Sequence, residues 1–288
     1  MKKSKLAKVL TVSLAALMVF GLASCGGGSG KVSDKDITVI SREEGSGTRD
    51  AFTELTGVLQ DDVDKTVDTA EISNSTSVVT QSVAGNDAAI GYISLGSLDD
   101  TVKAVKVDGV EATVDNIKSG DYKIQRPFNI VTKGEVKELP ADFIKFIMSK
   151  DGQKIIEDEG YISVNDNAEA YKASGLKGSI TLAGSTSVSP VMEVLADKYK
   201  ELNSGVTIEI QQTGSGAGIQ STTEGVCDIG MASRELKDDE TSQGLKSEEI
   251  ALDGIAVIVN KDNGVEDLSM DQIMKIFTGE ITNWADVK

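Results

Sequence analysis

Short apolar stretches alternate along the chain with longer stretches in which apolar residues recur every three or four positions. The short stretches are typical of strands, and several are nearly continuously apolar, as strands buried on both faces are. They cover residues 37–40, 89–93, 102–107, 128–131, 180–183, 206–210 and 255–259. Helical spacing is clearest within 143–155 and 188–202. This alternation predicts an α/β fold in which mostly parallel sheets are covered by helices.

The N-terminal segment has the pattern of an export signal. Lysines precede an apolar run from Val9 to Leu22, which is short for a membrane-spanning helix, and small residues follow it. We therefore expect residues 1–24 to be a signal peptide. The sequence LASC resembles a bacterial lipobox, which predicts lipid attachment at Cys25, with residues 25–36 as a flexible spacer that tethers the protein outside the cell membrane. The alternative is an ordinary cleaved signal followed by an incidental cysteine.

Composition narrows the classes of function. The chain has 288 residues, a formal net charge of −17, no histidine and two cysteines. The negative charge disfavours nucleic acid or an anionic membrane as partners of the folded surface, so any anion site must be local. The lack of histidine removes imidazole-based catalysis and most zinc sites, and we expect no metal, no cofactor and no enzymatic activity.

Three strand-to-helix turns carry the candidate chemistry. Each ends a predicted strand with glycine and hydroxyl residues, and a helix is expected to follow. The turns are Arg42 to Thr48 in SREEGSGT, Gly184 to Ser187 in AGSTS, and Thr213 to Gly216 in TGSGAG. A helix N-terminus offers free N–H donors and a partial positive charge, glycine allows close approach, and serine or threonine adds hydroxyl donors. Together the turns predict a site for an oxyanion.

Each turn has a simpler interpretation when it is considered alone. Serine or threonine before a helix is usually only an N-cap. None of the turns has the spacing of a Walker A loop, and GSGAGI lacks the full spacing of a dinucleotide fingerprint. The oxyanion hypothesis therefore depends on three such turns occurring in one chain, one of them with an arginine.

Taken together, several stretches make the chain similar to a known family. GSITLAGSTSVSPVMEVLADKY, IEIQQTGSGAGIQ, DIGMASRELK, ALDGIAVIVN, IFTGEITNW, VISREEGSGTRDAF, AIGYISL and QRPFNIVT resemble the substrate-binding lipoprotein of the bacterial high-affinity phosphate ABC transporter. The resemblance implies two α/β lobes joined by crossing strands, which close on phosphate. One lobe would comprise 37–124 and 261–288, and the other 125–260. The phosphate ligands implied by matching motifs are Arg42, Ser46, Gly47, Thr48, Thr186, Ser187 and Ser215, with Glu44 orienting Arg42.

One departure from the family concerns selectivity. Family members carry an aspartate after the serine of the DIG-A-S segment, where it accepts a proton of phosphate and thereby rejects sulfate; here the position is Arg234. Asp253, a carboxylate in an apolar predicted strand, is the substitute that we expect to contact phosphate. The alternatives for Asp253 are a strand-end cap or an ion pair with Arg234, which is expected to support the site.

A second departure concerns the order of the segments. In the family, the block from Leu176 to Trp284 precedes the block from Ile37 to Val164, whereas here it follows. The order predicts a circular permutation, with the usual termini joined through a linker at 167–178. A misassembled gene or a fragment of a tandem duplicate are the alternatives.

The resemblance implies a monomeric binding protein that captures inorganic phosphate outside the membrane and delivers it to permease subunits. Two other functions stay open: binding of another tetrahedral oxyanion, such as sulfate or molybdate, or an adhesin or scaffold that reuses the fold. A phosphatase is disfavoured, because no nucleophile stands beside a base.

Overall fold

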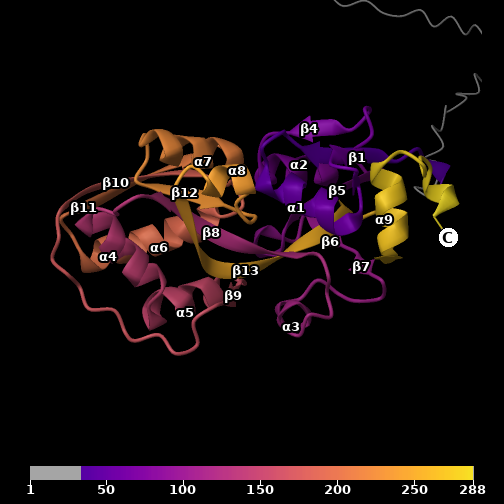
Figure 1. Cartoon of the computed structure of the whole chain (residues 1–288). Helices are drawn as coiled ribbons and strands as arrows, with labels where there is room; N and C mark the ends of the chain where they lie inside the picture. The colour runs from indigo at the N-terminus through magenta and orange to yellow at the C-terminus, as the bar shows by residue number, and fades with distance from the viewer. Residues whose placement is uncertain (1–33, 288) are drawn as a thin grey trace, which may run out of the picture. The chain divides into compact units, whose positions relative to one another are not determined.

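The structure, a computed structural model, describes residues 34–287 and has the α/β architecture expected from the sequence (Figure 1). Its strands are β1 (Thr38–Arg42), β2 (Leu59–Gln60), β3 (Val63–Asp64), β4 (Glu71–Ser73), β5 (Ala89–Ser94), β6 (Val102–Ala104), β7 (Lys106–Val107), β8 (Gln125–Lys133), β9 (Ile162–Ser163), β10 (Gly178–Gly184), β11 (Val206–Gln212), β12 (Ile229–Ala232), β13 (Leu245–Asn260) and β14 (Asp267–Leu268). All seven predicted strand regions are confirmed, although 102–107 divides into β6 and β7. They divide because β6 pairs with β13 whereas β7 pairs with β14.

The helices lie between these strands, and short 3-10 turns occur at Leu95–Ser97 and Trp284–Asp286. The helices are α1 (Gly47–Thr56), α2 (Thr76–Gly85), α3 (Val114–Lys118), α4 (Glu138–Ile147), α5 (Lys150–Asp158), α6 (Ser189–Leu202), α7 (Ser215–Glu224), α8 (Asp238–Thr241) and α9 (Met270–Phe277). Helix α6 corresponds to the helical spacing at 188–202, and α4 and α5 to that at 143–155. Of the stretch 167–178, expected as a linker, residues 167–177 contain no helix or strand and Gly178 begins β10.

The main sheet runs in the order β11-β10-β12-β8-β13-β5-β1-β4, with β6 and β9 paired to β13 beside this path. The outer pairs are parallel: β10 with β11 and β12 at one end, and β1 with β4 and β5 at the other. Strands β8 and β13 run antiparallel between these two groups. Consecutive parallel strands need helical crossovers, which is why helices separate them along the chain.

Strand β13, the longest strand, connects the two groups because it pairs with strands on both sides. Its first part pairs with β8, its last part pairs with β5, and the register shifts between Glu249 and Ala251. In Figure 1 it runs as one continuous ribbon from beside β8 and β12 toward β5 and β6. A single strand thus carries the sheet from one group of elements into the other.

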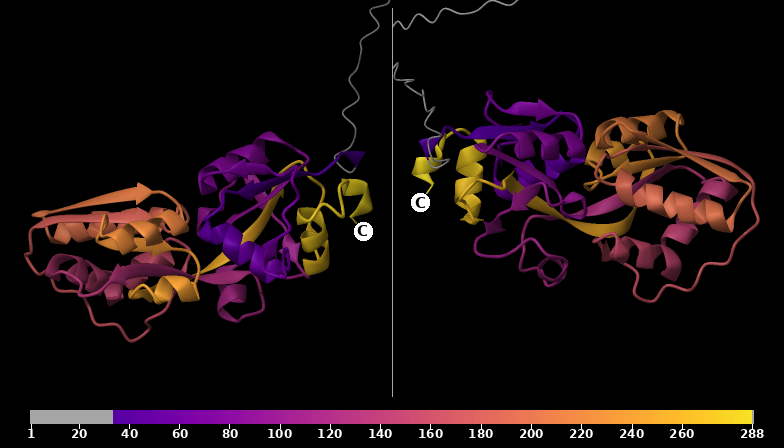
Figure 2. Two further views of the ribbon diagram at one scale, coloured as in Figure 1. Left: turned by 45° about the horizontal axis from the view of Figure 1, so that its top comes forward. Right: turned by 180° about the vertical axis from the view of Figure 1, so that it is seen from behind.

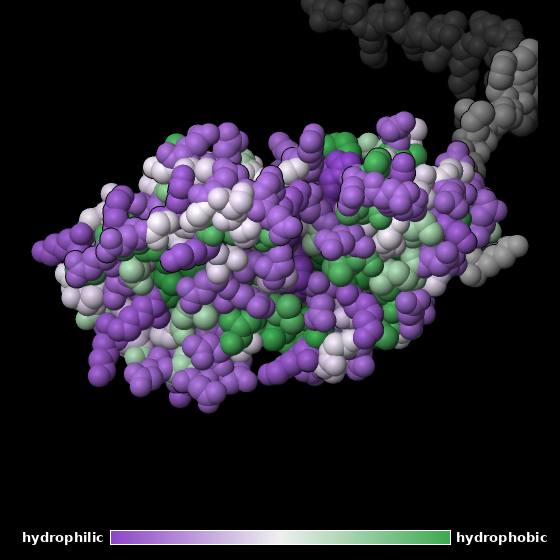
Figure 3. Space-filling model, in the orientation of Figure 1, coloured by the Kyte–Doolittle hydropathy of each residue, from purple (hydrophilic) through white to green (hydrophobic). Residues whose placement is uncertain are grey.

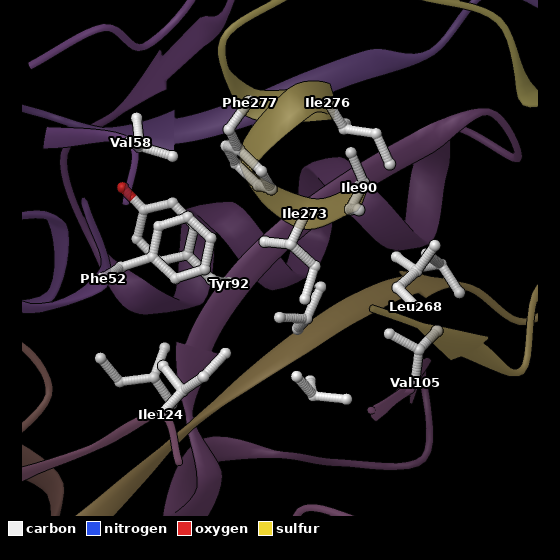
Figure 4. Packing of buried hydrophobic residues seen from close by; sticks show 14 of the residues in the cluster. Phe52, Val58, Ile90, Tyr92, Val105, Ile124, Leu268, Ile273, Ile276 and Phe277 are labelled. Atoms are coloured by element: carbon white, nitrogen blue, oxygen red, sulfur yellow. The ribbon is translucent and has the colours of Figure 1, made fainter. Parts of the chain in front are cut away.

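The hydrophobic side chains form separate clusters for the two groups. One large cluster contains Phe52, Tyr92 and Phe277, and a second contains Phe128, Phe146 and Tyr199. In the first cluster the rings of Phe52 and Tyr92 stack with centroids 3.9 Å apart (Figure 4). Burial raises the pKa of Tyr92 to about 12, although a hydrogen bond with Ser41 opposes the shift. The Tyr92 hydroxyl lies 2.9 Å from the Ser41 hydroxyl, at the end of β1, and so links this core to the turn that follows β1.

Segments from the two ends of the described chain lie side by side. In Figure 2 the C-terminal α9 (yellow) lies close to the first elements of the chain (indigo). The Ile37 N–H donates to the Thr282 carbonyl at 2.8 Å, and the Trp284 N–H donates to the Lys35 carbonyl at 3.0 Å. The group that contains β1 and α1 is therefore completed by residues more than 200 positions away along the chain.

Candidate functional site

The first turn connects β1 to α1. Arg42 ends the strand, Gly45 adopts φ = 80°, and the Ser46 hydroxyl accepts a hydrogen bond from the Arg49 N–H as the N-cap of α1. A positive φ favours glycine, and an N-cap serine satisfies one of the free donors of the helix. Gly47 has no room for a side chain, because a Cβ there would lie 2.5 Å from the Ser215 hydroxyl. The turn thus brings the backbone of α1 directly against the other group of elements.

Two further turns face the first one. After β10, the Ser185 hydroxyl accepts hydrogen bonds from the N–H groups of Ser187 and Val188, which shapes the start of α6. After β11, Gly214 adopts φ = 87°, and α7 begins at Ser215. Both turns end parallel neighbours in the same sheet, so they meet at the same edge.

The side chains of these turns converge on one buried group of hydroxyls. The Thr48 hydroxyl lies 3.0 Å from that of Ser187, and the Thr186 hydroxyl accepts a hydrogen bond from Nη2 of Arg42 at 3.1 Å. All members have at most 7% of their surface exposed. We call this group the hydroxyl cluster: Thr48, Thr76, Ser185, Thr186, Ser187, Ser215 and Ser233.

Thr76 and Ser233 belong to the cluster but were not among the predicted ligands. The Thr76 hydroxyl lies 3.1 Å from Ser187 and 3.3 Å from Thr186. Ser233, directly after β12, lies 3.0 Å from the Ser185 hydroxyl and 3.3 Å from that of Ser215. The available signal for Thr76 was the sequence SNST before a helical stretch, and for Ser233 it was a serine at the end of the apolar stretch DIGMA. Neither has the glycine-rich pattern of the other turns.

Four helices of ten or more residues begin at this cluster: α1, α2, α6 and α7. The positive ends of their dipoles and their free N–H groups therefore point to a common region. Arg42 adds one formal positive charge, and its side chain is only 2% exposed. The guanidinium supplies positive charge at the site of a chain whose formal net charge is −17. The face of the molecule seen in Figure 3 is largely hydrophilic, with smaller apolar patches. The arrangement can stabilise an oxyanion with many donors and one guanidinium.

The partner of Arg42 differs from the sequence prediction. We expected Glu44 to orient Arg42, but this is wrong, since Glu44 is exposed to solvent. Glu43 holds the guanidinium instead, accepting from Nε and Nη2 of Arg42 at 2.8 Å each. Nε also donates to the Ser73 carbonyl at 3.3 Å. The bidentate pair fixes the plane of the guanidinium beside the cluster.

Asp253 does not lie in the hydroxyl cluster, contrary to the expectation from the sequence. Its carboxylate is fully buried on β13, where it accepts from the Ser94 hydroxyl at 2.8 Å and from Nε and Nη2 of Arg126 at 3.2 and 3.1 Å. Burial raises the pKa of Asp253 to about 6, although Arg126 and Ser94 oppose the shift. The physical reason for the difference is register: Asp253 pairs with Arg126 across the β8–β13 ladder, so it belongs to the crossing strands.

Arg234 lies at the rim of the site and bridges the two groups of elements. Its Nε contacts Asp50 of α1 at 2.9 Å, while Nη1 and Nη2 contact Glu240 at 2.8 Å each. Burial alone would lower its pKa, but the carboxylates of Glu240 and Asp50 raise the pKa of Arg234 above its usual value. Arg234 therefore connects α8 to α1 rather than contacting the cluster.

A groove of about 590 Å³ leads from the cluster toward solvent. Its lining includes Thr76 and Thr186, together with Ser77, Ser97 and Gln212. Thr76 and Ser97 belong to one group of elements, and Thr186 and Gln212 to the other. Most of the lining residues are polar and uncharged, and Asp99 is the charged member of the lining.

Three sequence expectations concern other kinds of site. The predicted signal peptide and lipid-attachment residue Cys25 lie outside the described residues. Within residues 34–287, no group of three or more histidine, cysteine or acidic side chains is arranged to hold a metal ion. Among the same residues, no helix has both the length and the apolar character required to cross a membrane.

Comparison with known proteins decides the family. The PBP superfamily domain matches residues 28–151 and 169–288. Phosphate-binding protein PstS 2 of Streptococcus agalactiae is 52% identical over 294 residues, which cover 100% of this chain and 99% of the relative. The chain belongs to the phosphate-binding protein family.

A solved structure and a more distant relative add to this family assignment. The crystal structure of a phosphate ABC transporter, phosphate-binding protein from Streptococcus pneumoniae has 48% identity and a TM-score of 0.72, and the match covers 88% of this chain and 100% of that one. Phosphate-binding protein PstS of Bacillus subtilis matches over 127 residues at 38% identity, which is 43% of this chain and 42% of the relative. Members of the family are therefore similar to this chain over its whole length in some cases and over less than half of it in others.

Proposed function

We propose that this protein captures inorganic phosphate at the hydroxyl cluster and delivers it to the permease subunits of an ABC transporter. The observation that carries the proposal is the convergence of four helix N-termini, seven hydroxyls and Arg42 at one buried site. The names of relatives aligned over nearly their whole length agree with it. Binding needs no bond to be formed or broken, so the proposed role is transport rather than catalysis.

Capture requires the two groups of elements to separate and close again. They touch directly at the site, where the Gly216 N–H donates to the Gly45 carbonyl at 2.9 Å and Thr48 meets Ser187. Phosphate would replace the hydroxyl contacts that join one group to the other, Thr48 to Ser187 and Thr76 to Thr186 and Ser187. The β8 and β13 strands connect the two groups and are the natural hinge. Closure then follows from contacts that only the closed state completes.

We also propose an extracytoplasmic location with lipid attachment at Cys25 and a monomeric state. The sequence LASC and the glycine-rich stretch after it support the anchor. One lipid-bearing residue and a flexible spacer would keep the binding domain near its permease while leaving it free to open and close.

The function is tested by calorimetric titration of the ligand-free protein, first with phosphate and then with sulfate. The protein used begins after Cys25. We expect tight phosphate binding by calorimetry and sulfate affinity at least about 100-fold weaker, because the two anions differ in a proton that a specific site can read. Equal affinity for sulfate would favour a general tetrahedral oxyanion carrier. A folded protein that binds neither anion would favour the scaffold alternative.

The order of the segments is, in our proposal, a natural circular permutation relative to other family members. The alignment of the streptococcal relative over the whole chain supports a natural order rather than a misassembled gene confined to this sequence. The short match to the Bacillus protein is what a permuted order would produce, since only one block aligns at a time. The hydrogen bonds between residues 35–37 and 282–284 support the proposal, because a direct connection between these segments would restore the family order.

A chain rebuilt in the family order tests the permutation. It would join Trp284 to Ile37 through a short linker and open within 168–178, which contains no regular element before Gly178. We expect this protein to fold and to bind phosphate within about threefold of the original affinity, because no contact of the cluster changes. Failure to fold, next to a normally folded original chain, would contradict the proposal.

A further inference from the structure

Asp50 makes ion pairs that connect the two groups of elements. It lies in the first turn of α1, whereas Arg234 and Lys237 follow β12 in the other group. Nε of Arg234 donates to the Asp50 carboxylate at 2.9 Å, and Nζ of Lys237 lies 3.4 Å from the same oxygen. One carboxylate of the first group therefore faces two cations of the second.

Arg234 is held in position by residues of its own group. Nη1 donates to the Glu235 carbonyl at 2.7 Å and to Glu240 at 2.8 Å, and Nη2 donates to the other carboxylate oxygen of Glu240 at 2.8 Å. A bidentate carboxylate fixes the plane of a guanidinium, which leaves Nε directed at Asp50. If the two groups separate, the bond to Asp50 is lost while the bonds to Glu240 remain. Arg234 therefore keeps a counter-charge in both states, and the Asp50 bond belongs to the closed state.

The surroundings of the Asp50–Arg234 pair determine how much it can contribute. Ion pairs on the open surface contribute little, because water and salt screen them. The side chain of Arg234 is 8% exposed and that of Asp50 is 27% exposed, so this pair is shielded more than an open surface pair. A groove of about 480 Å³, whose lining includes both residues, gives water and ions a route to the pair. Its contribution should therefore be moderate and should decrease as salt is added.

The pair is connected to the hydroxyl cluster through short stretches of backbone. Thr48 precedes Asp50 by two residues in α1, and its hydroxyl lies 3.0 Å from that of Ser187 in the opposite group. Ser233 of the cluster directly precedes Arg234. Within residues 34–287 the side chains of Asp50 and Arg234 make no hydrogen bond to the cluster. The pair thus acts on the distance between the two sides of the site rather than on the anion.

We propose that the Asp50–Arg234 pair, supported by Lys237, stabilises the closed state and thereby sets the lifetime of bound phosphate without contacting it. The inference rests on the proposed phosphate-binding function. Asp50 and Arg234 are positioning residues in this proposal. A ligand enclosed between two groups dissociates only after they separate, so a bond present only in the closed state slows dissociation and leaves association nearly unchanged.

The test compares Asp50→Asn with Glu54→Gln in the protein that begins after Cys25. Calorimetry gives the phosphate Kd, and a chase of labelled phosphate with unlabelled phosphate gives the dissociation rate. For Asp50→Asn we expect the dissociation rate and the Kd to rise together by about three- to tenfold, so that the association rate is unchanged. Glu54→Gln removes the same charge from an exposed residue of α1 that lines the same groove, and it should change neither quantity.

Two further measurements separate a closing contact from a structural role of Asp50 in α1. The difference in dissociation rate between the original protein and Asp50→Asn should shrink at high salt, because salt screens the pair. In an Arg234→Gln background, Asp50→Asn should change the dissociation rate by less than about twofold, because its partner is already absent. Thermal unfolding of each variant shows that it folds, and if Arg234→Gln does not fold the salt dependence decides.

The outcomes separate this inference from the proposed function. If Asp50→Asn leaves the dissociation rate unchanged, or raises the Kd only by slowing association, the pair does not hold the closed state and the inference is overturned. An equal effect of Glu54→Gln, or an effect of Asp50→Asn that does not depend on salt, also overturns it. If the unaltered protein binds no phosphate, it is the proposed function that fails.

Discussion

Two arginine–carboxylate pairs lie on the path of the main sheet, and they differ in what surrounds them. The Arg42–Glu43 pair lies at the end of β1 beside the hydroxyl cluster, with the arginine 2% and the glutamate 25% exposed. The Arg126–Asp253 pair joins β8 to β13 and is 1% and 0% exposed. The first arginine also contacts Thr186, a hydroxyl of the opposite group, whereas Nη1 of Arg126 is without a hydrogen-bond partner among the described residues.

The difference teaches that a buried charge pair is not in itself a ligand site. The Arg42 pair has neighbours that can reorganise around an anion, namely hydroxyls and helix N-termini. The Arg126 pair has only fixed protein partners on continuous strands, and its role is to join them. Function follows from the surroundings of the pair rather than from its charges.

The largest effect on phosphate affinity should come from removing the arginine of the Arg42–Glu43 pair. Arg42→Ala removes the guanidinium that donates to Thr186 of the cluster and leaves Glu43 without its counter-charge. We expect phosphate affinity to fall by about 100-fold or more in calorimetry, because a hydrogen-bonded buried charge is lost. The melting temperature should show that the protein still folds.

Lys275→Ala is the control for Arg42→Ala. Lys275 is a cation on α9 that pairs with Asp271 at 2.7 Å, far along the chain from the turns of the site. It should leave phosphate affinity unchanged. An equal loss in both variants would mean that overall charge, and not the Arg42 contacts, governs binding, and the site assignment would then be wrong.

Features that depend on residues close together along the chain could be predicted from the sequence. Strand-to-helix turns at Ser46, Ser187 and Ser215 could be found because glycine, hydroxyl residues and the change from strand to helix spacing occur within a few positions. The α/β fold followed from the alternation of apolar patterns in the same way. These features depend on neighbours along the chain.

The remaining features depend on neighbours in space. The Asp253 and Arg126 partners are 127 residues apart, and the sequence does not show which face of β13 carries Asp253. Thr76 reaches Ser187 from 111 residues away, without any special pattern around it. The error of one residue between Glu43 and Glu44 has a local cause, because the direction of each side chain in a turn depends on backbone angles that the sequence does not specify.

The second pair is tested with Asp253→Asn, which should change the pH dependence of the free energy of unfolding and have less effect on phosphate affinity than Arg42→Ala. The pKa of Asp253 is about 6 in the folded protein, compared with 3.8 ordinarily, because burial disfavours its charged form. Between these values the folded state binds a proton that the unfolded state has released, so the contribution of Asp253 to stability decreases as the pH rises from about 4 to about 6 and is constant above. The expected decrease is about 1–3 kcal/mol.

The contribution of Asp253 is isolated by denaturant unfolding from pH 4 to 7. The original protein and Asp253→Asn are compared. The stability of the original protein relative to Asp253→Asn should decrease over this range, because asparagine does not titrate, while the stability relative to Asp271→Asn on exposed α9 should not. Phosphate affinity of Asp253→Asn should stay within about twofold, because Asp253 contacts Ser94 and Arg126 rather than the hydroxyl cluster. A tenfold loss of phosphate affinity with an unchanged pH profile would instead place Asp253 at the ligand, and the distinction between the two pairs would fail.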